Sequence, residues 1–214
     1  MIDPVHLKEE LKPILKNLIK DTLLKNLYSE HSQLIEKLLF RAIAEFVKVD
    51  LRIKNYTELA NIVIKEFTDG LIRKEGEIEA YPEDRVLIQL NLLRSIVSQC
   101  HTRKDMRVKF LGESFMVDLV SLVEFIVRTQ DSSEQRDKIV ESGLFIICVM
   151  MPNKKKEDCD RSKQIVAVLS LLLRITERLR QMKGNQRKTA EGLIIQAITK
   201  AMRHRSPQIE SMCT

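Results

Sequence analysis

The stretch that decides the fold is residues 86–151, which read VLIQLNLLRSIVSQCHTRKDMRVKFLGESFMVDLVSLVEFIVRTQDSSEQRDKIVESGLFIICVMM. Three strongly apolar segments lie in it, separated by short polar intervals, and this pattern predicts three consecutive helices. The middle segment, 115–127, has too many apolar residues for a single stripe. These are Phe115, Met116, Val117, Leu119, Val120, Leu122, Val123, Phe125, Ile126 and Val127. Since a helix covered on most sides packs against several others, the rest of the chain is expected to supply its neighbours.

Helical spacing of apolar residues continues on both sides of this stretch. Together the patterns predict about eight helices, with a short extra one at 104–111. The predicted ranges are 14–27, 33–49, 59–71, 82–100, 104–111, 115–127, 133–150, 165–182 and 187–202. Residues 74–81 (KEGEIEAY) are expected to form a loop. No run of alternating polarity is long enough to predict a strand.

Individual residues mark some of these helices. Pro82 suits a first helical position, and acidic residues follow it in the first turn. Ser132 and Gln135 have the spacing of a capping box at the start of the helix at 133–150. Gly143 lies in the interior of that helix, where a glycine indicates a close crossing of two helices.

The predicted helices start about 25 residues apart, so that a pair of helices takes about 50 residues. Two-helix repeats of armadillo and HEAT type are slightly shorter. Residues 83–150, with a long helix, a short one, Gly112 and a third helix, resemble the three-helix armadillo unit. The resemblance implies an all-α antiparallel helix stack, an α-solenoid of about eight helices. We expect one helical-repeat domain over 1–203 and a flexible tail over 204–214.

A nine-residue stretch supports a second resemblance. Residues 107–115 (RVKFLGESF) are similar to the arginine-phenylalanine-glycine-glutamate stretch of the MIF4G domain, a HEAT-type helical domain of translation and mRNA-decay factors. The rest of the chain departs from that pattern. This resemblance implies an RNA-associated domain in translation or mRNA metabolism as the alternative function.

The cysteines indicate the compartment. Cys100, Cys148, Cys159 and Cys213 form no CxxC pair, and two of them lie in apolar helical segments. We therefore expect reduced thiols in an intracellular protein, cytoplasmic or nuclear. No N-terminal stretch resembles a signal peptide, and no uncharged run reaches about 18 residues, so no membrane association is expected.

The sequence lacks the motifs of several enzyme classes. GxGxxG, GxxxxGK[ST] and GxSxG do not occur, and the four histidines are scattered. Cys100 and His101 are adjacent, so on a helix they point about 100° apart, which is typical of a buried thiol beside a helix-end histidine. The sequence therefore predicts no catalytic residues, no cofactor and no metal site.

Basic residues are concentrated near the C-terminus. Residues 161–205 contain eleven Lys and Arg but only two Asp and Glu, in a chain of net charge +6. The candidate binding residues of this region are Arg174, Arg178, Lys183, Arg187, Lys188, Lys200 and Arg203. Three interpretations remain open: a solvated surface, a site for an acidic protein segment, and a site for the phosphates of RNA or DNA. The absence of Trp and the low aromatic content count against nucleic acid.

These observations favour a non-enzymatic scaffold or adaptor. Such a domain would hold a partner protein's helix or extended peptide in a groove between helices, near residues 87–127, or on the basic C-terminal region. A homo-oligomer, with the first or last helix pair closing the array against a second copy, is a further possibility.

Overall fold

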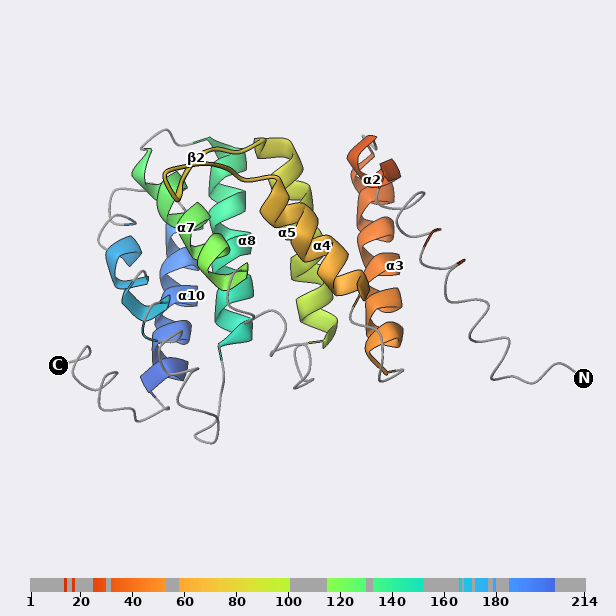
Figure 1. Ribbon diagram of the computed structural model, residues 1–214. Helices are drawn as coiled ribbons and strands as arrows, with labels where there is room; N and C mark the ends of the chain where they lie inside the picture. Colours follow the sequence, from red (N-terminus) through yellow and green to blue (C-terminus); the bar gives the residue numbers. More distant parts are fainter. Residues whose placement is uncertain are drawn as a thin grey trace, which may run out of the picture.

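The computed structural model (Figure 1) describes residues 25–29, 32–52, 58–100, 115–129, 133–151 and 185–202, with positions 14, 17, 166, 168–170, 172–176 and 179. Most of the described residues are helical, which confirms the all-α class. The elements are α2 (Lys25–Ser29), α3 (Gln33–Arg52), α4 (Glu58–Asp69), β1 (Ile72–Lys74), β2 (Glu77–Ala80), α5 (Glu83–Cys100), α7 (Phe115–Arg128), α8 (Glu134–Met150) and α10 (Asn185–Met202). The described positions between 166 and 179 are helical as well.

Several predicted helices are confirmed to within a few residues, namely those at 33–49, 82–100, 115–127, 133–150 and 187–202. Three other expectations cannot be compared with the structure. The short helix at 104–111 and the tail at 204–214 lie outside the described residues. Most of the stretch at 107–115, which resembles the MIF4G domain, lies outside them as well.

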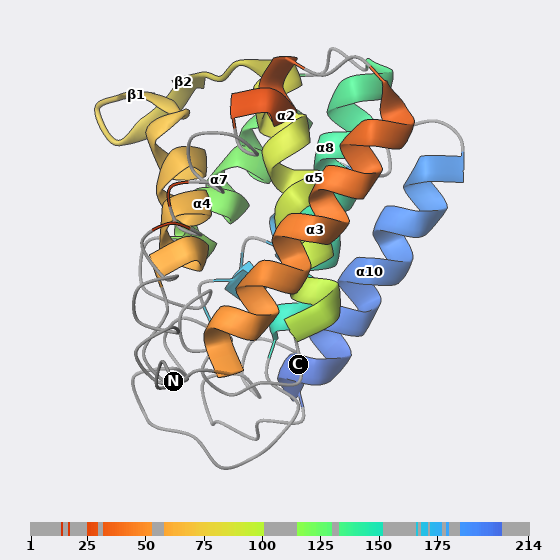
Figure 2. The ribbon, with the colours of Figure 1, turned by 90° about the vertical axis from the view of Figure 1, so that its right-hand side faces the viewer.

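Four helices, α3, α5, α8 and α10, lie side by side in a row and run in the same direction (Figure 2). Contacts between α5 and α8 show that these two helices run in the same direction and which of their residues lie side by side. Asp84 accepts a hydrogen bond from Gln135, and further along the two helices Ser142 donates one to Asn91. At the far ends of α8 and α10, Lys200 lies beside Cys148. The helices of the row are therefore parallel, each offset from the next by about 50 residues.

A second layer covers one face of this row. In it, α4 contacts α3, α5 and α7, and α7 contacts α8 and the hairpin. The helical positions between 166 and 179 lie beside α7 (Figure 1). From α3 to α10, the described helices thus alternate between the two layers. The helices of the row start at residues 33, 83, 134 and 185, which is a spacing of about 50 residues.

The apolar core lies between the two layers. Its largest fully buried side chains include Phe67 of α4 and Phe115 of α7, whose rings meet edge to face at 5.5 Å. On α7 nearly every apolar side chain from Phe115 to Ile126 is buried, and Val117 is the main exception. The prediction that this helix is covered on most sides is therefore correct.

Gly143 marks a close crossing of α7 and α8, as its position in an apolar helix predicts. A Cβ atom placed on Gly143 would lie 2.7 Å from Cγ2 of Val123, closer than two carbon atoms can approach. Glycine is therefore required for these two helices to pack at this distance.

Two local predictions were wrong. Residues 72–80 are a two-stranded antiparallel hairpin and not a loop. Its two-residue turn, Glu75-Gly76, has positive φ at both positions (52° and 86°), the requirement of a type I′ turn whose twist matches the strands. The cap of α8 is Ser133, whose hydroxyl accepts a hydrogen bond from the backbone N–H of Arg136 at 3.2 Å. The predicted capping residue, Ser132, precedes it.

Candidate functional site

The hairpin is held against α7 by one ion pair and two apolar contacts. The guanidinium of Arg73 donates to Asp118 Oδ1 at 2.5 Å, and the Asp118 side chain is only 7% exposed. Ile78 is buried, and the ring of Tyr81 packs edge to face on Phe125 at 6.0 Å. These contacts fix the hairpin turn beside the middle of α7.

The surroundings of Tyr81 also affect its ionisation. Burial raises the pKa of Tyr81 to about 12, and the neighbouring Glu83 carboxylate acts in the same direction. The Arg136 guanidinium opposes the shift. Arg136 in turn donates to Glu83 at 2.6 Å, so that the first turns of α5 and α8 meet beside this tyrosine.

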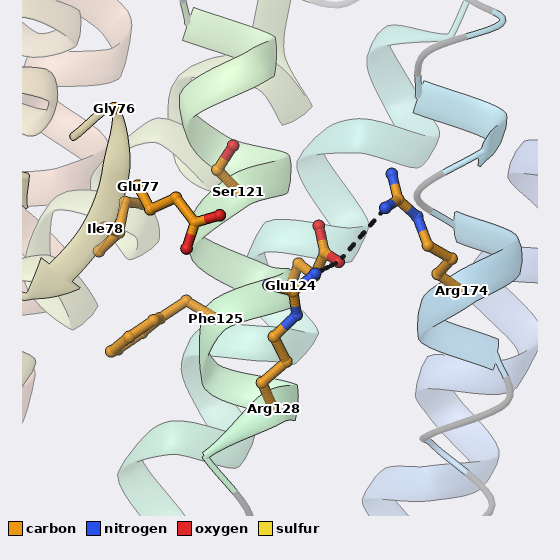
Figure 3. Close-up of a pocket in the computed structure, with 8 residues that line it drawn as sticks. All are labelled: Gly76, Glu77, Ile78, Ser121, Glu124, Phe125, Arg128 and Arg174. Atoms are coloured by element: carbon orange, nitrogen blue, oxygen red, sulfur yellow. Dashed lines mark hydrogen bonds and ion pairs between the residues drawn. The ribbon is translucent and has the colours of Figure 1, made fainter. Parts of the chain in front are cut away.

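A pocket of about 210 Å³ opens between the hairpin turn, α7 and the helical positions near residue 174. Its lining residues are Gly76, Glu77, Ile78, Ser121, Glu124, Phe125, Arg128 and Arg174 (Figure 3). The volume is below the range of about 300–1,000 Å³ that is usual for sites of cofactors and drug-sized ligands. A pocket of this size suits one or two side chains of a bound polypeptide.

The charges of the pocket are arranged around Glu124. This carboxylate is 13% exposed and forms ion pairs with Arg128, one helical turn later, and with Arg174 across the pocket. Arg174 is 60% exposed, and 3.9 Å separates its Nη1 atom from Glu124 Oε1, beyond hydrogen-bond distance. Within the described residues, its side chain forms no hydrogen bond. The exposed guanidinium presents N–H groups of the kind that bind a carboxylate or phosphate.

Glu77 gives the pocket a second acidic group. Its side chain points from the hairpin into the pocket, on the side opposite Arg174 (Figure 3). The hydroxyl of Ser121 lies between these two sides, and the rings and methyl groups of Phe125 and Ile78 form the apolar part of the lining. The pocket thus combines two acidic and two basic side chains, and a ligand with groups of both signs would match it.

Three of the predicted basic residues have described side chains, and the structure places each in different surroundings. Arg174 lines the pocket, and Lys188 is exposed near the start of α10. Lys200 donates a hydrogen bond to the carbonyl oxygen of Cys148 at 2.7 Å, in the last turn of α8. Lys188 and Lys200 are twelve residues apart, about 18 Å along the helix axis. These three residues therefore do not form one cluster.

The other four predicted basic residues cannot be placed in the same way. Arg187 belongs to α10, and its side chain lies outside the described part of the structure. Arg178, Lys183 and Arg203 lie outside the described residues.

Most of the pocket was not predicted from the sequence. Ser121, Phe125 and Arg128 are spaced at i, i+4 and i+7, so a helical wheel places them on one face of α7. The Glu77 and Arg174 sides of the pocket come from segments that are distant in sequence, and no local pattern could have indicated that they meet.

Other kinds of site were searched for among the described ranges. No group of three or more His, Cys, Asp and Glu side chains there is placed to hold a metal ion. No described helix combines the length and the apolar character that crossing a bilayer requires. No protein-family model, curated protein or solved structure matches this chain.

Proposed function

We propose that the protein is a non-enzymatic scaffold or adaptor built as an armadillo- or HEAT-type α-solenoid. The observation that carries the fold proposal is the alternation of helices between two layers, with the parallel row repeating about every 50 residues. Repeats of this kind stack into extended arrays whose surfaces bind other polypeptides. Because related folds serve many functions, the site itself must support the binding role.

The pocket beside the hairpin is the proposed site for a segment of the partner. Arg174 offers exposed guanidinium N–H groups, and Glu77 offers a carboxylate on the opposite side. Phe125 and Ile78 provide the apolar part of the lining, on the hairpin side of the pocket (Figure 3). An extended peptide with an acidic side chain at Arg174 and a basic one at Glu77 satisfies both charges, and an apolar group of the same peptide covers Phe125 and Ile78 on the hairpin side.

Glu124 has a distinct role in this proposal. Its ion pair with Arg128 neutralises the carboxylate, so an incoming acidic side chain meets Arg174 without strong repulsion. Substituting Arg128 therefore weakens binding indirectly. The negative charge of Glu124 would then have no ion pair with Arg128 and would repel the acidic side chain of the ligand.

Site-specific photo-crosslinking tests the proposal. A benzophenone amino acid at position 77 lies at the pocket and replaces the Glu77 carboxylate, so that Arg174 supplies the remaining charged contact in this test. The same group at the exposed position Lys138 of α8 is the matched control. We expect crosslinked protein adducts from position 77 that are absent from position 138, that survive nuclease treatment and that disappear in Arg174→Glu. The same adducts with Arg174→Glu would show that the pocket does not bind the partner.

The nuclease arm separates this proposal from the RNA-associated alternative. If the adducts at position 77 are destroyed by ribonuclease, the ligand is RNA and the adaptor role is wrong. Binding that falls steeply with salt concentration would accompany that outcome, because each neutralised phosphate releases counterions.

A further inference from the structure

The free edge of β2 faces the pocket. Glu77 and Ile78 are consecutive residues of this strand, so their side chains leave it on opposite faces. Both residues line the pocket, together with Gly76, whereas none of the described residues of β1 does. A cavity that is lined from both faces of a strand lies along its edge, and the other edge of β2 is paired with β1. The pocket therefore lies where β2 has no strand beside it (Figure 3).

The register of the hairpin determines which backbone groups point from that edge. Lys74 and Glu77 flank the two-residue turn and pair with each other, so their N–H and C=O groups point across the hairpin. The next pair, Arg73 and Ile78, is then of the non-hydrogen-bonded kind, in which both residues direct these groups outwards. The N–H and C=O of Ile78 therefore point from the free edge of β2 towards the pocket.

These two backbone groups form no hydrogen bond within the described part of the chain, although Ile78 is only 5% exposed. Nearly all buried backbone N–H and C=O groups in proteins are hydrogen-bonded, because leaving them unpaired is unfavourable. The adjacent pocket gives a ligand access to both groups. An extended polypeptide satisfies them together, as an added strand does at the edge of a sheet.

We propose that the partner segment binds in this pocket as a short antiparallel strand, and that one of its residues pairs with Ile78 through two backbone hydrogen bonds. This inference rests on the proposed function, because it requires a polypeptide in the same pocket. In an antiparallel pair a single residue makes both hydrogen bonds, which suits a pocket of only about 210 Å³.

The pairing predicts the sequence of the bound segment. The residue opposite Ile78 has its side chain on the same face as the buried Ile78 side chain, so an apolar group is expected there. The residue that follows it along the segment lies opposite Glu77, because the two strands run in opposite directions. A basic side chain at that position is a direct cross-strand neighbour of the Glu77 carboxylate. The expected motif is therefore an apolar residue followed directly by a lysine or arginine.

Peptides selected from a phage-displayed library of random heptapeptides test the pairing on the full-length protein. The selection keeps peptides that bind the wild type and do not bind Arg174→Glu, so that they occupy the pocket. One such peptide is synthesised with each backbone N–H methylated in turn, and its Kd is measured by fluorescence anisotropy. We expect methylation of one amide to weaken binding at least about tenfold, and methylation of the two neighbouring amides to change it less than about threefold. The sensitive residue is expected to be apolar and followed by a basic one.

A change in the protein backbone gives the matched comparison. Replacing Ile78 by its α-hydroxy acid turns one amide into an ester and removes the N–H that faces the pocket, while the side chain stays. The same replacement at Arg73 removes the N–H that points from the opposite edge of the hairpin. We expect the ester at position 78 to weaken binding of the peptide about five- to tenfold, and the ester at position 73 to leave its Kd unchanged.

Exchange of the Ile78 amide, measured by NMR on the unmodified protein, gives a second readout where an ester chain does not fold. Bound peptide is expected to slow this exchange at least about tenfold, because the amide then forms a hydrogen bond. Unchanged exchange in a saturated complex would contradict the pairing.

Other results would overturn the proposal in distinguishable ways. Peptides that require Arg174 but tolerate methylation at every amide, and bind both ester variants equally, would show that side chains alone hold the segment, and the proposed function would stand. A basic residue two positions before the sensitive amide would indicate a parallel strand. The absence of any Arg174-dependent peptide would overturn the proposed function as well. A wild-type dimer that the ester at position 78 dissociates would identify a second copy as the occupant.

Discussion

Gly143 of α8 and Val123 of α7 approach so closely that any side chain at position 143 must displace its neighbour. Only 2.7 Å separates the Cβ position of residue 143 from Val123 Cγ2. We expect Gly143→Ala to lower the free energy of unfolding by about 1–3 kcal/mol, the usual cost of overpacking a core. Urea denaturation measures this change.

A matched glycine provides the control for that substitution. Apart from the backbone of its own helix, no atom of the described residues lies within 4 Å of the Cβ position of Gly192 in α10. Gly192→Ala is expected to stabilise the protein by up to about 1 kcal/mol, because alanine has the higher helix propensity. The double variant Gly143→Ala/Val123→Ala should recover part of the loss, and no recovery would mean that the strain lies elsewhere.

The ion pair between Arg73 and Asp118 is expected to contribute to stability, since the carboxylate is almost fully buried. Arg73→Ala leaves that charge without its partner and should cost about 2–3 kcal/mol. A double-mutant cycle with Asp118→Ala measures the coupling energy. The exposed pair Lys138–Glu134 should show a much smaller coupling, because solvent screens it. Equal couplings would contradict the structural role of the hairpin contact.

Two basic residues of α10 are expected to behave differently. Lys200 hydrogen-bonds a carbonyl in the last turn of α8, where the helix leaves its own carbonyl groups without intrahelical partners. Lys200→Met should lower stability by about 1–2 kcal/mol. Lys188 is exposed, and Lys188→Met should change stability little. Thermal unfolding of the two variants, compared side by side, distinguishes a structural lysine from a surface one.

The ionisation of Tyr81 predicts a change of stability at alkaline pH. Burial raises its pKa to about 12, above the unfolded value of 10. The neutral phenol therefore favours the folded state, and this contribution is complete below pH 10 and is lost as the pH rises towards 12. The chain contains three tyrosines and no tryptophan, so phenolate absorbance measures the ionisation of tyrosine without interference from tryptophan. Tyr81→Phe should remove the titration step near pH 12.

The helices of the core were predictable because their signal is local. Apolar spacing and the residues around Pro82 located α5, and the density of apolar residues on α7 predicted its burial. The hairpin was not predicted because its strands have three and four residues, too few for a pattern of alternation. Its turn, Glu75-Gly76, differs from the Asn-Gly and Asp-Gly pairs that usually announce a type I′ turn.

The candidate site was harder to predict than the fold. Arg174 was identified as a binding residue from the composition of the C-terminal region. Its neighbours Glu124 and Glu77 became apparent only when three distant segments were brought together. Lys200 was identified by the same charge argument, and its hydrogen bond to α8 depends on how the helices of the row align. Composition describes the charge of a region, whereas the partner of each charge is decided by tertiary contacts.

The parallel direction of α3, α5, α8 and α10 has an electrical consequence. Each helix has a macrodipole with its positive end at the N-terminus, and four parallel dipoles add where antiparallel ones would cancel. Acidic residues in the first turns of α3, α5 and α8 offset this positive potential. No acidic residue occurs in the first turn of α10, and Arg187 and Lys188 are located there. The row therefore has a permanent dipole moment along its helices, and its positive end is strongest where α10 begins.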